Sequence, residues 1–292
     1  MILISLLLIL FLEYQFKLSR VLKQQFHADA WFGRWLDFIV VKLPQDWPWL
    51  GYLIQVFIPV LIVMWLAESQ AGLIISAVQF VFVLIVLGYS LGPIDQNTHL
   101  DTYFEALKQN DLDAAADEIQ NNLNQRSVVL HADSIDSLGR QVTNLILRQC
   151  NFRLFGVLFY FVIFGIGGAL AYNLVCSFEF HHRENEDSPF QNISRRVRHA
   201  FDWLPQRITG LLYGLAGDFN GAMQVYLKYF FKSGENCTGL LEQTGLGALG
   251  FSEEQRPESA LEENYEAMAL VSRSAMVFVL IIAILTVFGW LN

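Results

Sequence analysis

The sequence is short of charged residues and of cysteine. Of its 292 residues, 16% are charged, whereas an average soluble domain carries about a quarter. This shortage of polar surface argues against an ordinary soluble protein. The three cysteines, Cys150, Cys176 and Cys237, are far apart and odd in number, which argues against a zinc-type spacing and against a disulfide scaffold. We therefore expect small apolar fillers at these positions.

Motifs for metal, nucleotide and nucleic-acid binding are also missing. His181 and His182 are adjacent, so their side chains diverge, and the other histidines are isolated. Residues 234–250 are rich in glycine, but no Gly-Lys-Ser/Thr follows and no strand–turn–helix context fits a dinucleotide fingerprint. Acidic residues outnumber basic ones in segment 92–150. We therefore expect no metal site and no nucleic-acid partner.

What the sequence does contain is long apolar runs, because 54% of its residues are hydrophobic. A helix needs ~20 apolar residues to cross ~30 Å of hydrocarbon. Residues 47–66 and 72–91 meet this length, and 275–291 does so when 271–274 extend it. Residues 1–12 lack the basic start and small-residue cleavage site of a signal peptide. We interpret all four runs as membrane spans, the first one uncleaved.

A fifth run, 154–175, is interrupted by Gly165, Gly167 and Gly168. Such glycines permit close helix packing, a kink or a re-entrant turn. Basic residues between 17 and 42 place that loop in the cytoplasm and the N-terminus in the periplasm. Several arginines follow the fifth run, so the positive-inside rule holds there if the run dips and returns. The pattern favours a hairpin or a steeply broken helix.

These patterns predict an all-α, polytopic membrane protein with four to five spans, one of them Gly-broken or re-entrant, plus cytoplasmic helical segments. We expect one domain over 1–292, with an acidic helical insert at 92–150 and a polar region at 178–272. Within the insert, 102–123 reads as a helix pair with Asn110 as N-cap. Residues 234–250 are expected to form a flexible loop that could hold an anion, and 252–266 an acidic, solvated tether.

The stretch 202–219 places charge beside a short apolar run. Pro205 suits the first turn of a helix, and Asp202 suits a position near its N-cap. The spacing therefore predicts a short capped helix at the membrane boundary, with Arg207 facing a polar pocket. Asp202 and Arg207 could form a structural ion pair or bind a ligand, and the residues alone leave both readings open.

Four features in this order resemble the AmpE family and, more distantly, the membrane-bound cobinamide-phosphate synthases CobD and CbiB. They are an acidic helix pair with Tyr103, Ala106, Leu107, Asp111 and Ala114; Asn151-Phe152-Arg153 before the Gly-broken run; Asp-Trp-Leu-Pro-Gln-Arg at 202–207; and the glycine-rich segment with Gly239, Glu242 and 247–250. The similarity covers nearly the whole chain, and the third feature is the most specific.

The synthases carry Glu-Asn-Thr-Ser-Asp where this sequence has Gln149 to Arg153. Both carboxylates, the groups most able to hold a metal or act as a base, are absent, so the resemblance points to AmpE. It implies an inner-membrane sensor or accessory protein in β-lactamase induction and peptidoglycan recycling, and no catalytic residues. Expected partners are the lipid bilayer, a muropeptide or phosphorylated small molecule, and cell-wall recycling proteins. The candidate ligand-binding residues are Asn151, Arg153, Asp202, Arg207, Gly239, Glu242, Tyr103 and Asp111.

Two alternatives stay open. One is a CobD-like amide-forming ligase or transferase acting on a phosphorylated amine, with a nucleotide or Mg²⁺ as its cofactor. Arg153, Arg207 and the glycine-rich segment favour it, because guanidinium groups bind phosphate or carboxylate through paired hydrogen bonds. The other is a small-solute transporter, suggested by the broken helix, although no inverted repeat is visible.

Overall fold

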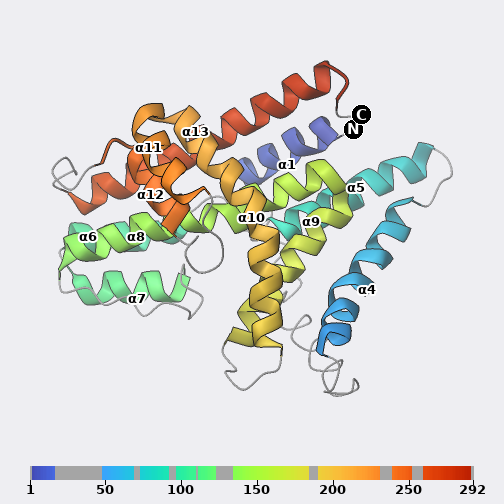
Figure 1. Cartoon of the computed structure of the whole chain (residues 1–292), viewed down its shortest axis with the longest axis horizontal. Helices are drawn as coiled ribbons and strands as arrows, with labels where there is room; N and C mark the ends of the chain where they lie inside the picture. The colour runs from blue at the N-terminus through green and yellow to red at the C-terminus, as the bar shows by residue number, and fades with distance from the viewer. Residues whose placement is uncertain are drawn as a thin grey trace. The chain divides into compact units, whose positions relative to one another are not determined.

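The structure is a computed structural model that describes residues 2–16, 48–68, 73–91, 97–109, 111–122, 134–183, 190–230, 239–251 and 259–290. Every regular element in these ranges is a helix, as the apolar and helical periodicities predicted (Figure 1). The prediction of an all-α membrane protein is thereby confirmed. The chain divides into two compact units, which are described separately.

The first unit comprises Met1–Ile94, Phe152–Trp203 and Ile282–Asn292. Its helices are α1 (Ile2–Phe16), α4 (Pro48–Glu68), α5 (Leu73–Ser90), α9 (Gly156–Arg183) and the first half of α10 (Gln191–Ala216). Tyr52, Val56 and Val60 of α4 pack with Leu174 and Phe178 of α9 in its core. The apolar runs read from the sequence therefore supply this unit's packing.

The second unit comprises Asp95–Asn151 and Leu204–Ile281. It holds α6 (Asn97–Lys108), α7 (Leu112–Asn122), α8 (Ile135–Cys150), the second half of α10, α11 (Phe219–Tyr229), α12 (Gly239–Ala248) and most of α13 (Ala260–Val287). A five-residue π-helical turn, Asn151–Phe155, connects α8 to α9.

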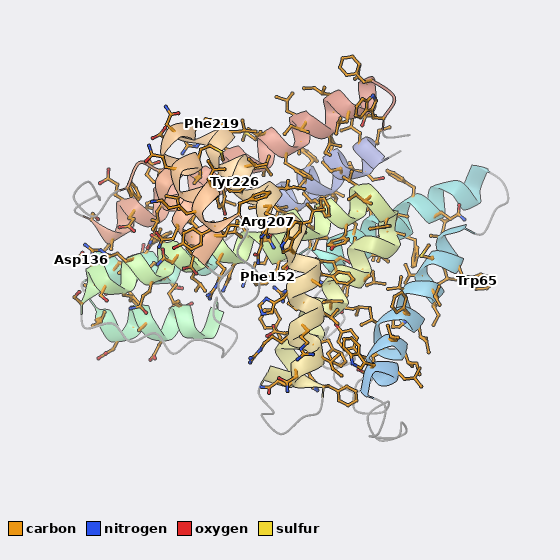
Figure 2. The ribbon with its side chains drawn as sticks, in the orientation of Figure 1. Trp65, Asp136, Phe152, Arg207, Phe219 and Tyr226 are labelled. Carbon is orange, nitrogen blue, oxygen red and sulfur yellow. The ribbon has the colours of Figure 1, made fainter. Side chains whose placement is uncertain are left out.

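Within the described ranges, three helical stretches are long and apolar enough to cross a membrane: Trp49–Ala67, Ile135–His181 and Ala260–Val287. The helices α1 and α5 contain shorter apolar stretches. On α4, apolar side chains also face outward: Phe57, Leu61 and Trp65 are 52%, 59% and 74% exposed. Figure 2 labels Trp65. A contiguous exposed apolar face of this kind marks contact with lipid or another protein, and its length fits a lipid-facing helix.

Helix α9 folds back on itself at Gly165, as Figure 1 shows. The backbone there has φ 64° and ψ −153°, a region that is open essentially to glycine alone. The rings of Tyr160 and Tyr172 stack 5.2 Å apart, although they would lie about 18 Å apart along a straight helix. Ile163 and Phe164, beside the turn, are 51% and 63% exposed. The prediction of a hairpin is confirmed, and its tip is apolar.

Helix α10 corrects the prediction for 202–219. The helix begins at Gln191, so Asp202 lies in its middle and Pro205 is inside it, with neither near an N-cap. An internal proline lacks the N–H that would bond the carbonyl four residues earlier. Here that carbonyl belongs to Phe201, and the hydroxyl of Tyr160 donates to it at 2.9 Å. The sequence suggested a helix start because this compensating donor is far away along the chain.

The predicted helix pair in the acidic insert is present as α6 and α7. The predicted cap, Asn110, lies outside the described residues. Asp111 has the capping role instead, because its Oδ1 accepts a hydrogen bond from the backbone N–H of Ala114 at 3.1 Å. A side-chain acceptor before a first helical turn satisfies an N–H that has no intrahelical partner.

Two further expectations were wrong. Of the expected flexible loop 234–250, residues 239–248 form the helix α12, and residues 234–238 lie outside the described part. Glycine lets α11 and α12 touch there, since a Cβ on Gly247 would lie 2.6 Å from the Gly221 carbonyl oxygen. The expected tether is helical from Ala260 onward, and Glu263 is 2% exposed. Residues 252–258 lie outside the described part.

Candidate functional site

Asp202 is the centre of a buried polar cluster in the first unit. It is 6% exposed and sits on α10. Its Oδ1 accepts a hydrogen bond from the Tyr172 hydroxyl at 2.5 Å, and its Oδ2 accepts one from Arg198 Nε at 2.6 Å. Arg198 is four residues earlier on the same helix, which a continuous α10 brings onto the same face. A buried carboxylate needs such pairing.

Arg198 has a second acidic neighbour and two aromatic ones. Its Nη1 lies 3.7 Å from Glu179 Oε2, and its guanidinium lies over the rings of Phe152 and Phe180 at 5.4 and 5.5 Å from their centroids. Burial lowers the pKa of Arg198, but negative neighbours, Asp202 foremost, outweigh burial and raise the pKa above its ordinary value. Nη1 is nevertheless buried without a hydrogen-bond partner.

Arg153 shares the Phe152 ring with Arg198 but not its acidic neighbours. Its guanidinium lies 5.6 Å from the ring centroid, and the residue is 6% exposed. Within the part of the chain that the structure describes, Arg153 makes neither a hydrogen bond nor an ion pair through its guanidinium. A buried charge in this condition is costly unless something compensates it.

Tyr52 of α4 completes this cluster and was missed by the sequence analysis. It is 2% exposed, and its ring meets Phe178 edge-on at 4.5 Å. Its hydroxyl lies within electrostatic range of Arg198 and has no hydrogen-bond partner. A buried tyrosine hydroxyl usually finds a partner, so a tyrosine inside an apolar span was a usable signal. We call Tyr52, Phe152, Arg153, Tyr172, Glu179, Phe180, Arg198 and Asp202 the arginine cluster.

The π-helical turn positions two predicted ligand residues. It begins at Asn151, which belongs to the second unit, and includes Arg153, which belongs to the first. Single π turns inside longer helices occur frequently at functional sites. Asn151 is 2% exposed, and its Oδ1 accepts a hydrogen bond from Thr209 Oγ1 at 3.1 Å. Asn151 thereby connects α8 to α10.

Arg207 connects helices of the second unit. It is 2% exposed, and its Nε and Nη2 donate to the Phe230 carbonyl oxygen at 2.9 and 2.6 Å. The hydroxyl of Tyr226 donates to the Arg207 carbonyl oxygen at 3.1 Å; both residues are labelled in Figure 2. The hydrogen bonds between the Arg207 guanidinium and the Phe230 carbonyl oxygen therefore join α10 to the end of α11.

Tyr103 belongs to a second set of helix-connecting bonds. Its hydroxyl donates to Asn264 Oδ1 at 2.8 Å, and Asn264 Nδ2 donates to the Gly139 carbonyl and to Thr143 Oγ1, each at 2.8 Å. Burial, followed by the charge of Glu263, raises the pKa of Tyr103. One amide thus joins α6, α8 and α13, and Asn264 was missed because it fell in the expected tether.

The family model described as "Regulatory signalling modulator protein AmpE" matches residues 1–292. The chain belongs to the AmpE family. It is also similar to the protein named "Protein AmpE" from Shigella flexneri, with 24% identity over 302 residues, covering 99% of both chains. No solved structure matches it. Together with the lipid-facing helices, the family match shows a regulatory membrane protein.

In this member of the AmpE family, two of the predicted ligand residues belong to the first unit and the others to the second. Arg153 and Asp202 both lie in the arginine cluster, linked through Arg198. Glu242, in the first turn of α12, pairs with Arg148 of α8 at 3.4 Å, and burial raises its pKa more than Arg148 lowers it. Gly239, the first residue of α12, faces the Tyr229 ring.

Buried thiols in this AmpE-family chain fit the expectation of apolar fillers. Cys150 and Cys176 are free and buried, and Cys237 lies outside the described residues. Cys150 Sγ lies 2.6 Å from the Tyr213 hydroxyl, which donates to the Leu147 carbonyl oxygen at 2.7 Å. These contacts add to the connections between α8 and α10.

Proposed function

We propose that the protein is an inner-membrane sensor or accessory protein that acts in β-lactamase induction and peptidoglycan recycling by binding an acidic ligand. The family description supports the signalling part of this proposal, because it refers to a regulatory modulator and its model matches the whole chain. The observation that carries the binding part is Arg153, which is 6% exposed and has no acidic neighbour in contact among the described residues.

A charge in a membrane-embedded segment is expensive and usually marks a functional site. Arg153 lies within the apolar stretch Ile135–His181, just before the hairpin of α9. Muropeptides carry free carboxylates, which guanidinium groups bind through paired hydrogen bonds. A buried cation without an acidic neighbour suits a sensor for such fragments, and Asn151 and Arg207 are proposed to support it indirectly by joining α8 to α10 and α10 to the end of α11.

The remaining predicted ligand residues are proposed to contribute through the fold. Tyr103, Asp111, Gly239 and Glu242 connect or begin helices of the second unit. For the membrane, we propose the bacterial inner membrane with a periplasmic N-terminus, because basic residues cluster between positions 17 and 42. Reporter fusions after residues 150, 190 and 250 test this topology, and an N-terminus found in the cytoplasm would contradict it.

Deletion and complementation test the signalling role. A strain that lacks the gene is expected to show altered β-lactamase activity after treatment with an inducing β-lactam, and the wild-type gene is expected to restore it. Arg153→Gln is expected to fail to restore induction, whereas Arg196→Gln, at an exposed arginine on α10, is expected to succeed. Immunoblots of membranes control for protein level. Unchanged induction in the deletion strain would sink the proposal.

A further inference from the structure

We infer that helices α10 and α11 of the second unit form one apolar face that contacts lipid at the boundary of the membrane. This α10–α11 face comprises Leu204, Ile208, Leu211 and Leu215 of α10 and Phe219, Met223 and Leu227 of α11. The inference goes beyond the proposed function, because it concerns contact with the membrane and does not depend on a ligand at Arg153.

The first step is that α10 and α11 pack closely side by side and run in opposite directions. A Cβ on Gly210 would lie 3.0 Å from the Tyr226 ring, and a Cβ on Gly214 would lie 3.4 Å from the Ala222 Cβ. Residue numbers therefore rise along α10 while those of the contacting residues fall along α11. The two helices form an antiparallel pair with glycines of α10 at their contact.

The second step is that the apolar residues lie on one side of this pair. Members of the face recur at intervals of four, three and four residues on α10 and every four residues on α11, so each set forms a stripe. Leu211 and Leu215 each follow a glycine that faces α11, and Met223 and Leu227 each follow a residue that faces α10. In an antiparallel pair of right-handed helices, the residue after a contact position turns to the same side on both helices. The two stripes therefore make one surface.

The third step is that this surface is exposed and almost without charge. Five of its members are between 40% and 66% exposed, namely Leu204, Leu211, Leu215, Phe219 and Leu227, and Figure 2 labels Phe219. Between residues 204 and 229, all of which the structure describes, the exposed charged residues are Asp218 and Lys228. A contiguous apolar surface of this kind marks contact with lipid or with another protein.

The fourth step identifies lipid as the neighbour, through continuity with the span α13. Ser274 Oγ of α13 donates to the Leu212 carbonyl oxygen of α10 at 3.4 Å, so the two helices meet there. Arg273 precedes this serine, and the residues from 275 to the end of α13 carry no charge. Met276 and Leu280 of the span are 71% and 60% exposed. The α10–α11 face is therefore level with the start of the lipid-facing half of α13 and continues its surface.

The same residues place the contact at the boundary of the bilayer rather than at its centre. Asp218, between the two helices, is exposed, and its Oδ1 accepts a hydrogen bond from the Asn220 N–H at 3.0 Å. A carboxylate at the bilayer centre is costly. Amphipathic helices that lie along the interface bury their apolar side about 5–10 Å into the headgroup and acyl boundary, which keeps such a carboxylate near water.

Spin-label accessibility of the full-length protein in phosphatidylcholine vesicles tests the inference. Leu215→Cys and Leu227→Cys are made singly, with the native cysteines changed to alanine, and each carries a nitroxide. Oxygen concentrates in lipid, whereas a nickel chelate stays in water. The ratio of oxygen to chelate collisions is expected to be several-fold higher at both labels than at Asp117→Cys, an exposed site on α7. It is expected to approach the ratio at Leu280→Cys of the span.

Two results would overturn the inference. A collision ratio like that of Asp117→Cys at both labels would mean that the α10–α11 face lies in water. Labels that collide little with either reagent would mean that protein covers the face, and dipolar coupling between singly labelled copies would identify a second copy as that cover. Thermal unfolding of each labelled protein controls for folding, and Leu204→Cys replaces Leu215→Cys if the latter does not fold.

The depth of the contact is measured with bimane on the same cysteines and with brominated phosphatidylcholine. Bromine near the headgroup is expected to quench bimane at Leu215→Cys and Leu227→Cys more than bromine near the chain end does. Stronger quenching from the chain end would overturn the placement at the boundary. The signalling proposal is tested separately by Arg153→Gln in cells, so failure of either leaves the other standing.

Discussion

The two units hold their buried arginines Arg207 and Arg153 differently. In the second unit, Arg207 donates twice to the Phe230 carbonyl oxygen, and Asn264 makes three hydrogen bonds to neighbouring helices. In the first unit, Arg153 and the Tyr52 hydroxyl are buried and make no hydrogen bond with the described residues. Both units also hold buried polar atoms without a hydrogen-bond partner, Asn144 Oδ1 and Thr244 Oγ1 in the second unit among them. The two arginines differ in whether the guanidinium finds an acceptor among the described residues.

This difference separates polar groups that hold the fold together from polar groups that cost stability. A matched buried hydrogen bond contributes about 1 kcal/mol, and an unmatched group costs about as much or more. Natural proteins keep such costly groups mainly where function requires them. Arg207 and Asn264 therefore hold helices of the second unit together, whereas Arg153 is the residue of the first unit proposed to bind a ligand.

The largest expected effect comes from breaking the ion pair between Arg198 and Asp202 in the arginine cluster. Asp202→Ala leaves the charge of Arg198 without its closest counter-ion and removes the acceptor of Tyr172. Losing one partner of a buried ion pair costs about 3–5 kcal/mol, so the unfolding midpoint in nanodiscs should fall steeply. The double variant Arg198→Gln/Asp202→Ala is expected to recover part of the loss. Additive losses in the double variant would show that the pair is not coupled.

Removing the side-chain amide of Asn264, which joins three helices of the second unit, should have the next largest effect on stability. Asn264→Ala leaves the Tyr103 hydroxyl, the Gly139 carbonyl and Thr143 without this partner. At about 1 kcal/mol for each net hydrogen bond, the loss is about 3 kcal/mol. Asn220→Ala, at an exposed position on α11, is the matched control. A loss no larger than the control's would mean that the second unit does not depend on its matched bonds.

The helices could be predicted from the sequence because apolar runs and their breaks are local signals. The glycines at 165, 167 and 168 indicated a break in α9, and a positive φ at Gly165 produces the hairpin there. The start of α10 could not be predicted, since the donor that makes Pro205 tolerable is Tyr160, 45 residues earlier. Local rules describe Pro205 correctly as a poor helix residue, and a tertiary contact overrides them.

The candidate site was predictable in part for the same reason. The resemblance to the AmpE family singled out Arg153 and Asp202, but Tyr52 and Arg198 entered through contacts between distant segments, Tyr52 with Phe178 and Arg198 with Phe152. The glycine content of 239–248 predicted a loop. In the structure these residues form α12, and its glycines allow the backbones of two helices to approach closely. Composition alone does not distinguish flexibility from tight packing.

Arg153→Gln should change the stability of the protein less than the two variants above, and it should raise the stability where they lower it. Replacing an uncompensated buried charge by a neutral amide removes a desolvation cost, so the unliganded protein is expected to gain about 1–2 kcal/mol. Arg198→Gln is the comparison variant, because Arg198 lies over the same Phe152 ring. It should destabilise the protein, because it leaves the buried carboxylate of Asp202 without its arginine partner. Thermal unfolding of both variants in phosphatidylcholine nanodiscs measures the difference. A loss of stability in Arg153→Gln would mean that this arginine has a structural role like Arg207.

The smallest expected effect concerns Glu242, in the first turn of α12. Burial raises its pKa above the ordinary carboxyl range, and Arg148, whose side chain is 38% exposed, compensates in part. A raised folded-state pKa means that unfolding favours proton release. The contribution of Glu242 to stability is therefore greatest below the ordinary pKa and is lost as the pH rises through the raised value. Glu242→Gln should flatten this dependence by less than about 1 kcal/mol, because partly exposed ion pairs are weak. Unfolding midpoints measured from pH 4 to pH 8, with Glu266→Gln as an exposed control on α13, test this. A wild-type profile that rises across this range, and that Glu242→Gln makes flat, would show instead that the ion pair with Arg148 outweighs the burial of Glu242.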